Sequence, residues 1–469
     1  MMERQVRDTM GSMTVPADAY YGAQTARALL NFPISGLRAH PEFIRALAAI
    51  KLAAARSNAR SALLSRERAE AIEHAAREVF DGALHDQFVV DVFNAGAGTS
   101  MHMNANEVIA ARAREILGAD RGAADLIHPN DHVNLGQSTN DVIPTAIRLA
   151  GLVGMRRVAR GAENLAASLA AKAEEFDGTV KSGRTHLQDA SPIRLGQEFG
   201  AYAFCVSRGA ARIRAACDGL REIGMGGTAV GTGLNTRDEC RAQVVRELAG
   251  LYGEDLRPAE NLFEAMQSQA PVVEAMASVR GLALDLLRIT NDLRLLSSGP
   301  RTGLAEIALP AVQPGSSIMP GKVNPVICEA TAMVCFQVIG CDAVVAAASQ
   351  AGQLELNVMM PVIAYDFLFA LEIMGNALCI LRERCIDGIA ADAGRCLAYA
   401  EGSVAIATVL TPLIGYEKAA EIVGEAIAGG KSIRAVVEDC GLFSEAQIRS
   451  IFDLRRWTEP GLLDKDGPA

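Results

Sequence analysis

A single apolar stripe sets the strongest limit on how this chain can fold. From about Glu264 to Ser298, apolar residues recur at steps of three and four positions, the spacing of one face of an α-helix. A helix of that length exceeds the average in globular proteins and is typical of a long-helix bundle. The stripe consists of Val272, Met276, Val279, Ala283, Leu286, Ile289, Leu293 and Leu296.

Other parts of the chain repeat this helical pattern, whereas strand-like alternation is sparse. Together with the first stripe they predict a mainly α protein whose centre is a bundle of five long helices. The four additional helices are expected at residues 144–175, 196–223, 328–350 and 362–385.

The pattern changes twice along the chain and so predicts three domains. A mixed, mostly helical N-terminal domain is expected over residues 1–140, the long-helix bundle over 141–393, and a small helical domain over 394–469. In the last of these, "SEAQ" at Ser444–Gln447 has the form of a capping box that opens a short helix.

Composition excludes several classes of protein. A formal net charge of −10 argues against non-specific nucleic-acid binding. The most apolar run, Ala330–Ala348, contains Gln337 and Asp342, which favours a buried helix over a membrane span. The first residues lack the apolar segment of a secretory signal, and the ten cysteines form no C-x-x-C pair. We therefore expect a cytoplasmic protein with reduced thiols, no membrane partner and no zinc site.

Four glycine-containing segments concentrate polar side chains, against the helical background. They cover residues 96–107, 128–141, 182–192 and 314–325, and their small residues allow the backbone to approach a ligand. Many neutral donors and a single lysine suit a small dianion such as a dicarboxylate. No phosphate-binding or dinucleotide motif is present, so no cofactor is expected. The candidate residues are Thr99, Ser138, Thr139, Asn140, Thr185, His186, Ser316, Ser317, Lys322 and Asn324.

Each candidate also has an ordinary structural interpretation. Ser138 or Asn140 could cap a helix that begins near Pro144. Taken alone, His186 is more often a structural histidine, and Lys322 a solvated surface lysine. Only the joint occurrence of these residues favours a functional site.

The sequence of these segments resembles the aspartase/fumarase superfamily over essentially the full chain. The strongest match is "GSSIMPGKVNP" at Gly315–Pro325, and "HPNDHVNLGQSTND", "GRTHLQDASPIRLGQEF" and "SSGPRTGLAEIALP" support it. The resemblance implies a homotetramer whose core is a large bundle of central helices from all four subunits. It further implies active sites that each collect residues from three subunits.

Within the superfamily, two segments resemble aspartases more than fumarases: Ser138–Asn140 and "NDHVN" at Asn130–Asn134. The resemblance thus implies reversible elimination of ammonia from L-aspartate to give fumarate. A class II fumarate hydratase and a catalytically inactive structural relative are the alternatives. The polar set is intact, which speaks against the inactive relative. His102 stands where the family pattern has asparagine, and "NLGQ" before Ser138 is also unusual.

The resemblance also implies a role for each candidate. Ser316 would remove the C3 proton of the substrate and produce an aci-carboxylate dianion, while Gly315 and Gly321 would let the surrounding loop close. Neither a metal nor a cofactor enters this scheme. The β-carboxylate of the substrate would be bound by Ser317, Thr139, Lys322 and Asn324, and the α-carboxylate by Thr185 and His186. The ammonium would be surrounded by Thr99, Asn140 and His186, with Ser138 nearby. Glu329 would orient His186.

Overall fold

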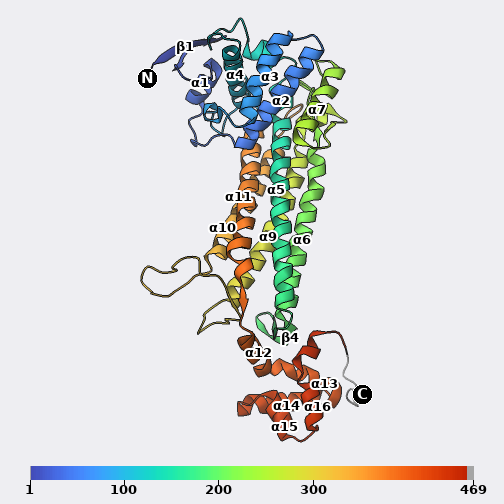
Figure 1. Cartoon of the computed structure of the whole chain (residues 1–469). Coiled ribbons are helices and arrows are strands. Elements are labelled where there is room, and N and C mark those ends of the chain that lie inside the picture. The colour runs from blue at the N-terminus through green and yellow to red at the C-terminus, as the bar shows by residue number, and fades with distance from the viewer. Residues whose placement is uncertain (1, 462–469) are drawn as a thin grey trace. The chain divides into compact units, whose positions relative to one another are not determined.

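The computed structural model describes residues 2–461, which are mainly α-helical with four short two-stranded sheets (Figure 1). This confirms the predicted fold class, and all five expected long helices are present. They are α5 (Thr139–Glu175), α6 (Leu195–Leu220), α9 (Ala270–Leu296), α10 (Val326–Ser349) and α11 (Met360–Arg384).

Helix α9 carries the stripe from which the bundle was predicted, and all eight of its residues are buried. The helix begins later than expected, because a separate short helix, α8 (Leu262–Gln267), precedes it. Pro271 explains the break: it has no N–H to continue the α8 hydrogen-bond ladder but is tolerated in the first turn of a new helix. The predicted start near Glu264 was therefore wrong by about two turns.

Helix α5 differs in the opposite direction, since it begins at Thr139 and contains Pro144 in its interior. The expected start at Pro144 was wrong because Ser138 and Asp141 stabilise the earlier turn. The Ser138 hydroxyl accepts a hydrogen bond from the Asn140 backbone N–H at 3.2 Å, and the Ser138 N–H donates to Asp141 Oδ1 at 2.9 Å. Ser138 therefore caps the helix, as one of the structural interpretations proposed.

The chain forms two compact units. The first unit comprises residues 1–160, 209–283 and 334–376, and the second comprises 161–208, 284–333 and 377–469. Long helices run through both units, so the three-domain division at 140 and 393 stays a prediction.

Among the shorter helices of the first unit, α2 (Pro41–Arg60) packs against α3 (Arg66–Phe80) and α7 (Asp238–Tyr252). An antiparallel hairpin of β1 (Glu3–Asp8) and β2 (Gly11–Pro16) lies near the N-terminus. The remaining elements are α1 (Ala23–Asn31), η1 (His85–Gln87), α4 (Thr99–Ile116), η2 (Pro129–Val133) and the parallel pair β5 (Glu222–Ile223) and β6 (Arg257–Pro258).

Two glycines of α5 allow it to pack closely on α11 within the first unit. A Cβ on Gly151 would lie 2.4 Å from Phe367, and one on Gly154 would lie 2.7 Å from Leu371. Real side-chain contacts do not occur at such distances, so a larger residue at either position would force the α11 side chains to move. The N-terminal end of α5, which carries predicted site residues, is thereby fixed on a rigid element.

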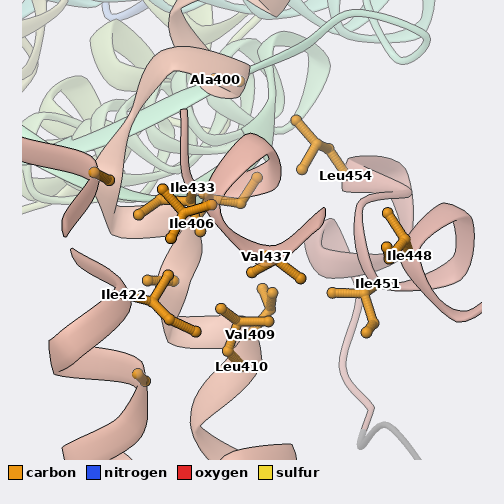
Figure 2. Close-up of a cluster of buried hydrophobic side chains, with 14 residues drawn as sticks. Ala400, Ile406, Val409, Leu410, Ile422, Ile433, Val437, Ile448, Ile451 and Leu454 are labelled. Atoms are coloured by element: carbon orange, nitrogen blue, oxygen red, sulfur yellow. The ribbon is translucent and has the colours of Figure 1, made fainter. Parts of the chain in front are cut away.

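The second unit ends in a small helical region with its own core. Side chains from η4 (Val404–Leu410), α14 (Tyr416–Gly429), α15 (Ile433–Asp439) and α16 (Glu445–Ile451) gather in one buried cluster (Figure 2). Both hydrogen bonds of the predicted capping box at Ser444 are present, which confirms that prediction. Smaller elements of this unit are β7 (Ile307–Ala308), η3 (Ile386–Gly388), β8 (Ala390–Ala391), α12 (Ala393–Gly402), α13 (Thr411–Ile414) and η5 (Leu454–Thr458).

By length and composition alone, α10 and the stretch Met360–Gly388 could each cross a membrane, and the bent pair Ala393–Gly402 with Val404–Ile414 would add a third span if counted as one. Helix α10 nevertheless carries Asp342, which forms an ion pair with Arg280 of α9 at 2.6 Å. The absence of a membrane partner stays a prediction.

Candidate active site

The predicted site residues fall into two groups, one in each unit. Thr99, Ser138, Thr139 and Asn140 belong to the first unit. The second unit holds Thr185, His186, Ser316, Ser317, Lys322, Asn324 and Glu329.

In the first unit, two helix N-termini bring two of the polar segments together. Thr99 is the first residue of α4 and Thr139 the first of α5, and their hydroxyl oxygens lie 3.2 Å apart. Gly98, in the left-handed conformation with φ +93°, precedes α4, and a Cβ there would lie 3.1 Å from the Ile143 side chain. Backbone N–H groups at both helix starts favour an anion nearby.

The hydrogen bonds of Thr99 and Asn140 leave one side-chain oxygen of each residue available as an acceptor. Thr99 donates its hydroxyl hydrogen to the Gly96 carbonyl at 2.6 Å. Asn140 donates from Nδ2 to the Ala229 carbonyl at 2.7 Å, which fixes the amide so that Oδ1 remains available. Two oxygen acceptors therefore lie in this part of the site, which suits a donor-rich group such as an ammonium.

Behind these residues lies a buried polar cluster that sequence reasoning did not predict as a whole. Lys51 of α2 is 0% exposed, and its Nζ lies 2.6 Å from His102 Nε2. The other ring nitrogen, His102 Nδ1, lies 2.9 Å from Thr139 Oγ1. Burial and the neighbouring Lys51 lower the pKa of His102 well below its usual value, so the ring is neutral. The available sequence signal was a lysine inside the otherwise apolar run "ALAAIKLAAA".

Asp141 is a second functional candidate that sequence reasoning missed. Its buried carboxylate accepts backbone hydrogen bonds from Ser138 at 2.9 Å, Thr228 at 3.0 Å and Gly226 at 3.1 Å. These bonds join the start of α5 to the segment that provides Ala229 for Asn140. Burial raises the pKa of Asp141 to about 6 despite the three donors.

In the second unit, Thr185 and His186 lie at the exposed tip of a β-hairpin. Strands β3 (Val180–Thr185) and β4 (Gln188–Arg194) are joined by His186 and Leu187, whose φ angles are +55° and +59°. Turns of this kind favour asparagine and glycine, and a leucine there carries backbone strain. Strain of this type is concentrated at functional sites, which supports the predicted role of the tip.

The base of this hairpin is held by a buried ionic triad. Glu306 is 0% exposed and accepts from Lys181 at 3.2 Å and from Arg184 at 2.9 Å. Lys181 also pairs with Glu198 of α6 at 3.0 Å. Glu306 belongs to the "SSGPRTGLAEIALP" segment, whose structural role is thereby identified: it anchors the hairpin that presents Thr185 and His186.

The segment with the strongest family resemblance is irregular between β7 and α10, as its glycine and proline content predicted (Figure 1). Its neck is closed by hydrogen bonds from the Gly315 N–H to the Lys322 carbonyl and from Asn324 Nδ2 to the Gly315 carbonyl, both at 2.7 Å. Beyond the neck, Ser316 Oγ accepts from the backbone N–H groups of Ile318 at 3.2 Å and Met319 at 3.0 Å. Such donors stabilise a serine alkoxide relative to its hydroxyl form.

One predicted contact of this unit is absent from the described part of the chain. Over residues 2–461, no hydrogen bond or ion pair joins Glu329 to His186. Ser317, Lys322 and His186 are exposed, so these side chains are free to contact a substrate or another chain. Their roles stay predictions.

The chain matches known lyases over nearly its whole length. Residues 11–340 match the family described as Lyase, and residues 406–459 match the fumarase C C-terminus. Aspartate ammonia-lyase of Bacillus subtilis is 47% identical over 99% of this chain and 98% of the relative. Class II fumarate hydratase of Halobacterium salinarum is 49% identical over the same shares.

Solved structures agree with these relatives. A fumarate lyase:delta crystallin from Brucella melitensis superposes with a TM-score of 0.95 at 47% identity, covering 98% of this chain and all of that chain. A class II fumarase from Schistosoma mansoni gives a TM-score of 0.93 at 35% identity, covering 97% and 99%. Sequence and fold therefore identify the same group of proteins.

Proposed function

Because the chain belongs to the aspartase/fumarase superfamily of lyases, we propose that it catalyses the reversible elimination of ammonia from L-aspartate to give fumarate. Aspartate ammonia-lyases recur among its relatives, for example from Pseudomonas aeruginosa at 45% identity. The Ser138–Asn140 sequence also follows the aspartase pattern.

One observation supports the choice of an amine substrate: the Thr99 hydroxyl hydrogen is already used, and the Asn140 amide is oriented by its bond to Ala229 so that Oδ1 is free. Their remaining oxygen atoms can only accept, and an ammonium offers three hydrogens to such acceptors. A hydroxyl leaving group, as in malate, offers one. The first-unit group is therefore better matched to aspartate.

The reaction needs a base at C3 and donors at the β-carboxylate. Ser316, with two backbone N–H groups already directed at its Oγ, is the proposed base. Proton removal leaves a dianion, which Thr139, Ser317, Lys322 and Asn324 stabilise more strongly than the substrate. Thr185 and His186 hold the α-carboxylate. The departing amine is protonated and needs little acid assistance.

We further propose that complete sites form in a homotetramer. Large apolar side chains on three bundle helices are exposed in the single chain: Phe204 of α6 at 65%, Leu284 of α9 at 52%, and Phe336 of α10 at 63%. Exposed apolar surface on long helices is typical of an interface. A four-subunit bundle would bury it, and cytoplasmic location is consistent with the free cysteines. Static light scattering should give four chains per particle; a monomer that is fully active would contradict this proposal.

The second candidate is fumarate hydration, which the 49% identical Halobacterium relative favours. The two reactions share fumarate and most of the site. Purified protein should therefore be offered L-aspartate and L-malate separately while fumarate formation is followed. We expect fumarate to form from aspartate at least about a hundredfold faster than from malate. A hydroxyl has a single hydrogen and cannot donate to both acceptor oxygens, those of Thr99 and Asn140. Fumarate from malate alone would favour the hydratase.

A further inference from the structure

The buried lysine behind Thr139 has no part in the scheme above. Lys51 lies within α2, is completely buried, and is surrounded by three acceptor atoms: His102 Nε2 at 2.6 Å, Gln137 Oε1 at 2.8 Å and Asn134 Oδ1 at 3.0 Å. Burying an ammonium is costly unless each of its hydrogens has a partner. Here three hydrogens meet three acceptors.

The two amides are fixed with their oxygen atoms toward Lys51. Asn134 donates from Nδ2 to the Gln137 carbonyl at 3.2 Å, and Gln137 donates from Nε2 to the Val133 carbonyl at 3.1 Å. Because carbonyls can only accept, neither amide can be reversed without losing these bonds. "NLGQ", which the family comparison found unusual, thus provides part of the ammonium site.

Contact with an ammonium determines the tautomer of His102. Burial lowers the pKa of Lys51, whereas the charge of Asp141 and the three acceptors around Nζ favour the ammonium form. In that form Lys51 only donates, so Nε2 of the neutral ring accepts and the ring hydrogen is on Nδ1. Nδ1 lies 2.9 Å from Thr139 Oγ1 and so donates to it. The Thr139 hydroxyl accepts from His102, and its own hydrogen can be directed either to Thr99 Oγ1, 3.2 Å away, or to a ligand.

From this geometry we propose that Lys51 and His102 are positioning residues that hold the Thr139 hydroxyl as a donor to the substrate carboxylate. The inference rests on the proposed function, since Thr139 is assigned there to the β-carboxylate. Without the Lys51 hydrogen, the opposite tautomer becomes accessible. His102 Nδ1 would then accept the Thr139 hydrogen and leave only lone pairs facing a negatively charged ligand.

A double-mutant cycle between Lys51 and Thr139 tests this chain of contacts. Lys51→Met keeps the side-chain length but cannot donate, and should lower kcat about tenfold with little change in KM, because the carboxylate gains charge in the transition state. Thr139→Val removes the donor itself and should lower kcat about a hundredfold. In the Thr139→Val background, Lys51→Met should lower kcat by less than about a further twofold.

The matched control is Ser57→Ala, which removes a buried hydrogen bond of the same helix, to the Cys240 carbonyl. Its small effect on kcat should be equal in both backgrounds. If Lys51→Met also lowers kcat equally in both backgrounds, Lys51 has only a structural role and the inference is overturned.

Variants at His102 provide an independent test if Lys51→Met folds poorly. His102→Leu should lower kcat about tenfold. His102→Asn should instead retain most of the wild-type kcat, because the amide nitrogen can take the place of Nδ1 and donate to Thr139. Equal loss in both variants would contradict the inference. Wild-type protein that turned over neither aspartate nor malate would instead overturn the proposed function, and this inference with it.

Discussion

The two groups of predicted site residues differ in how firmly each is held. In the first unit, Thr139 is connected through His102 to Lys51, which is fully buried and fully hydrogen-bonded. In the second unit, Ser317 and Lys322 are exposed on an irregular segment, and His186 is at the tip of a hairpin. The first group is therefore held in a fixed arrangement by the protein itself, whereas side chains of the second group are exposed.

This difference matters because charge stabilisation and proton removal, the functions proposed for the two groups, have different requirements. Donors and acceptors that stabilise charge work best when fixed in advance, since no reorganisation is then needed during the reaction. A base that must reach a carbon atom and then admit new substrate benefits from a segment that can move. The predictions below test this division, beginning with the largest expected effect.

The exposed segment should control turnover without controlling stability. We expect Ser316→Ala to lower kcat by at least about a thousandfold, because it removes the base, while the melting temperature stays unchanged. Gln313→Ala, an exposed change in the same irregular segment, should leave both quantities unaltered. Near-normal turnover by Ser316→Ala would show that another group removes the proton.

The hairpin should depend on its buried anchor. Glu306→Gln leaves Lys181 and Arg184 without their common carboxylate, and should lower the free energy of unfolding by about 3 kcal/mol in urea titrations. Glu175→Gln removes an exposed carboxylate that pairs with Lys172 and should cost less than about 0.5 kcal/mol. Comparable losses for both variants would mean that the triad is no stronger than a surface pair.

The buried cluster should give the protein a specific pH dependence. The pKa of His102 is lowered by burial and Lys51, so below the unfolded value of 6.5 the unfolded chain binds a proton that the folded chain excludes. The contribution of the neutral His102 ring to the free energy of unfolding is complete above pH 6.5 and is lost as the pH falls. Relative to His102→Asn, the wild type should lose about 1 kcal/mol of stability between pH 6.5 and about 5.5, measured by urea unfolding. A constant difference between the two proteins would indicate that His102 titrates normally.

The smallest effect is expected at the hairpin tip. Leu187→Gly relieves the positive φ and should raise the free energy of unfolding by about 0.5 kcal/mol, while raising KM a few-fold because the tip becomes less rigid. Leu354 is an exposed leucine with φ +50°, and Leu354→Gly should give a similar gain in stability without changing KM. Equal effects on KM would remove the special role of the tip.

Much of the fold was predictable because helices leave local signals. The buried stripe of α9 and the Ser444 capping box both depend on residues within a few positions of each other, and both are present. The starts of α5 and α9 were mistaken for a related reason. Pro144 and Pro271 restrict a helix, but neighbouring residues decide whether it begins before or after them.

The site was predictable only in part. Polar residues in glycine-containing segments led to the prediction of Thr99, Thr139 and Ser316, but Lys51 lies in an apolar helix far from them in the sequence. Its importance depends on a 2.6 Å contact with His102 that no spacing rule predicts. Glu306 likewise has no local signal, because its partners Lys181 and Arg184 are more than a hundred residues away.

The sequence by itself determined the helical bundle and the family, since periodicity and short motifs depend on neighbouring residues, and it predicted the reactive side chains. Only the tertiary structure decided which hydrogens are already used and which atoms remain for a ligand. That depends on distances between segments far apart in the chain, and it is why the acceptors at Thr99 and Asn140 and the lysine behind Thr139 emerge only after folding.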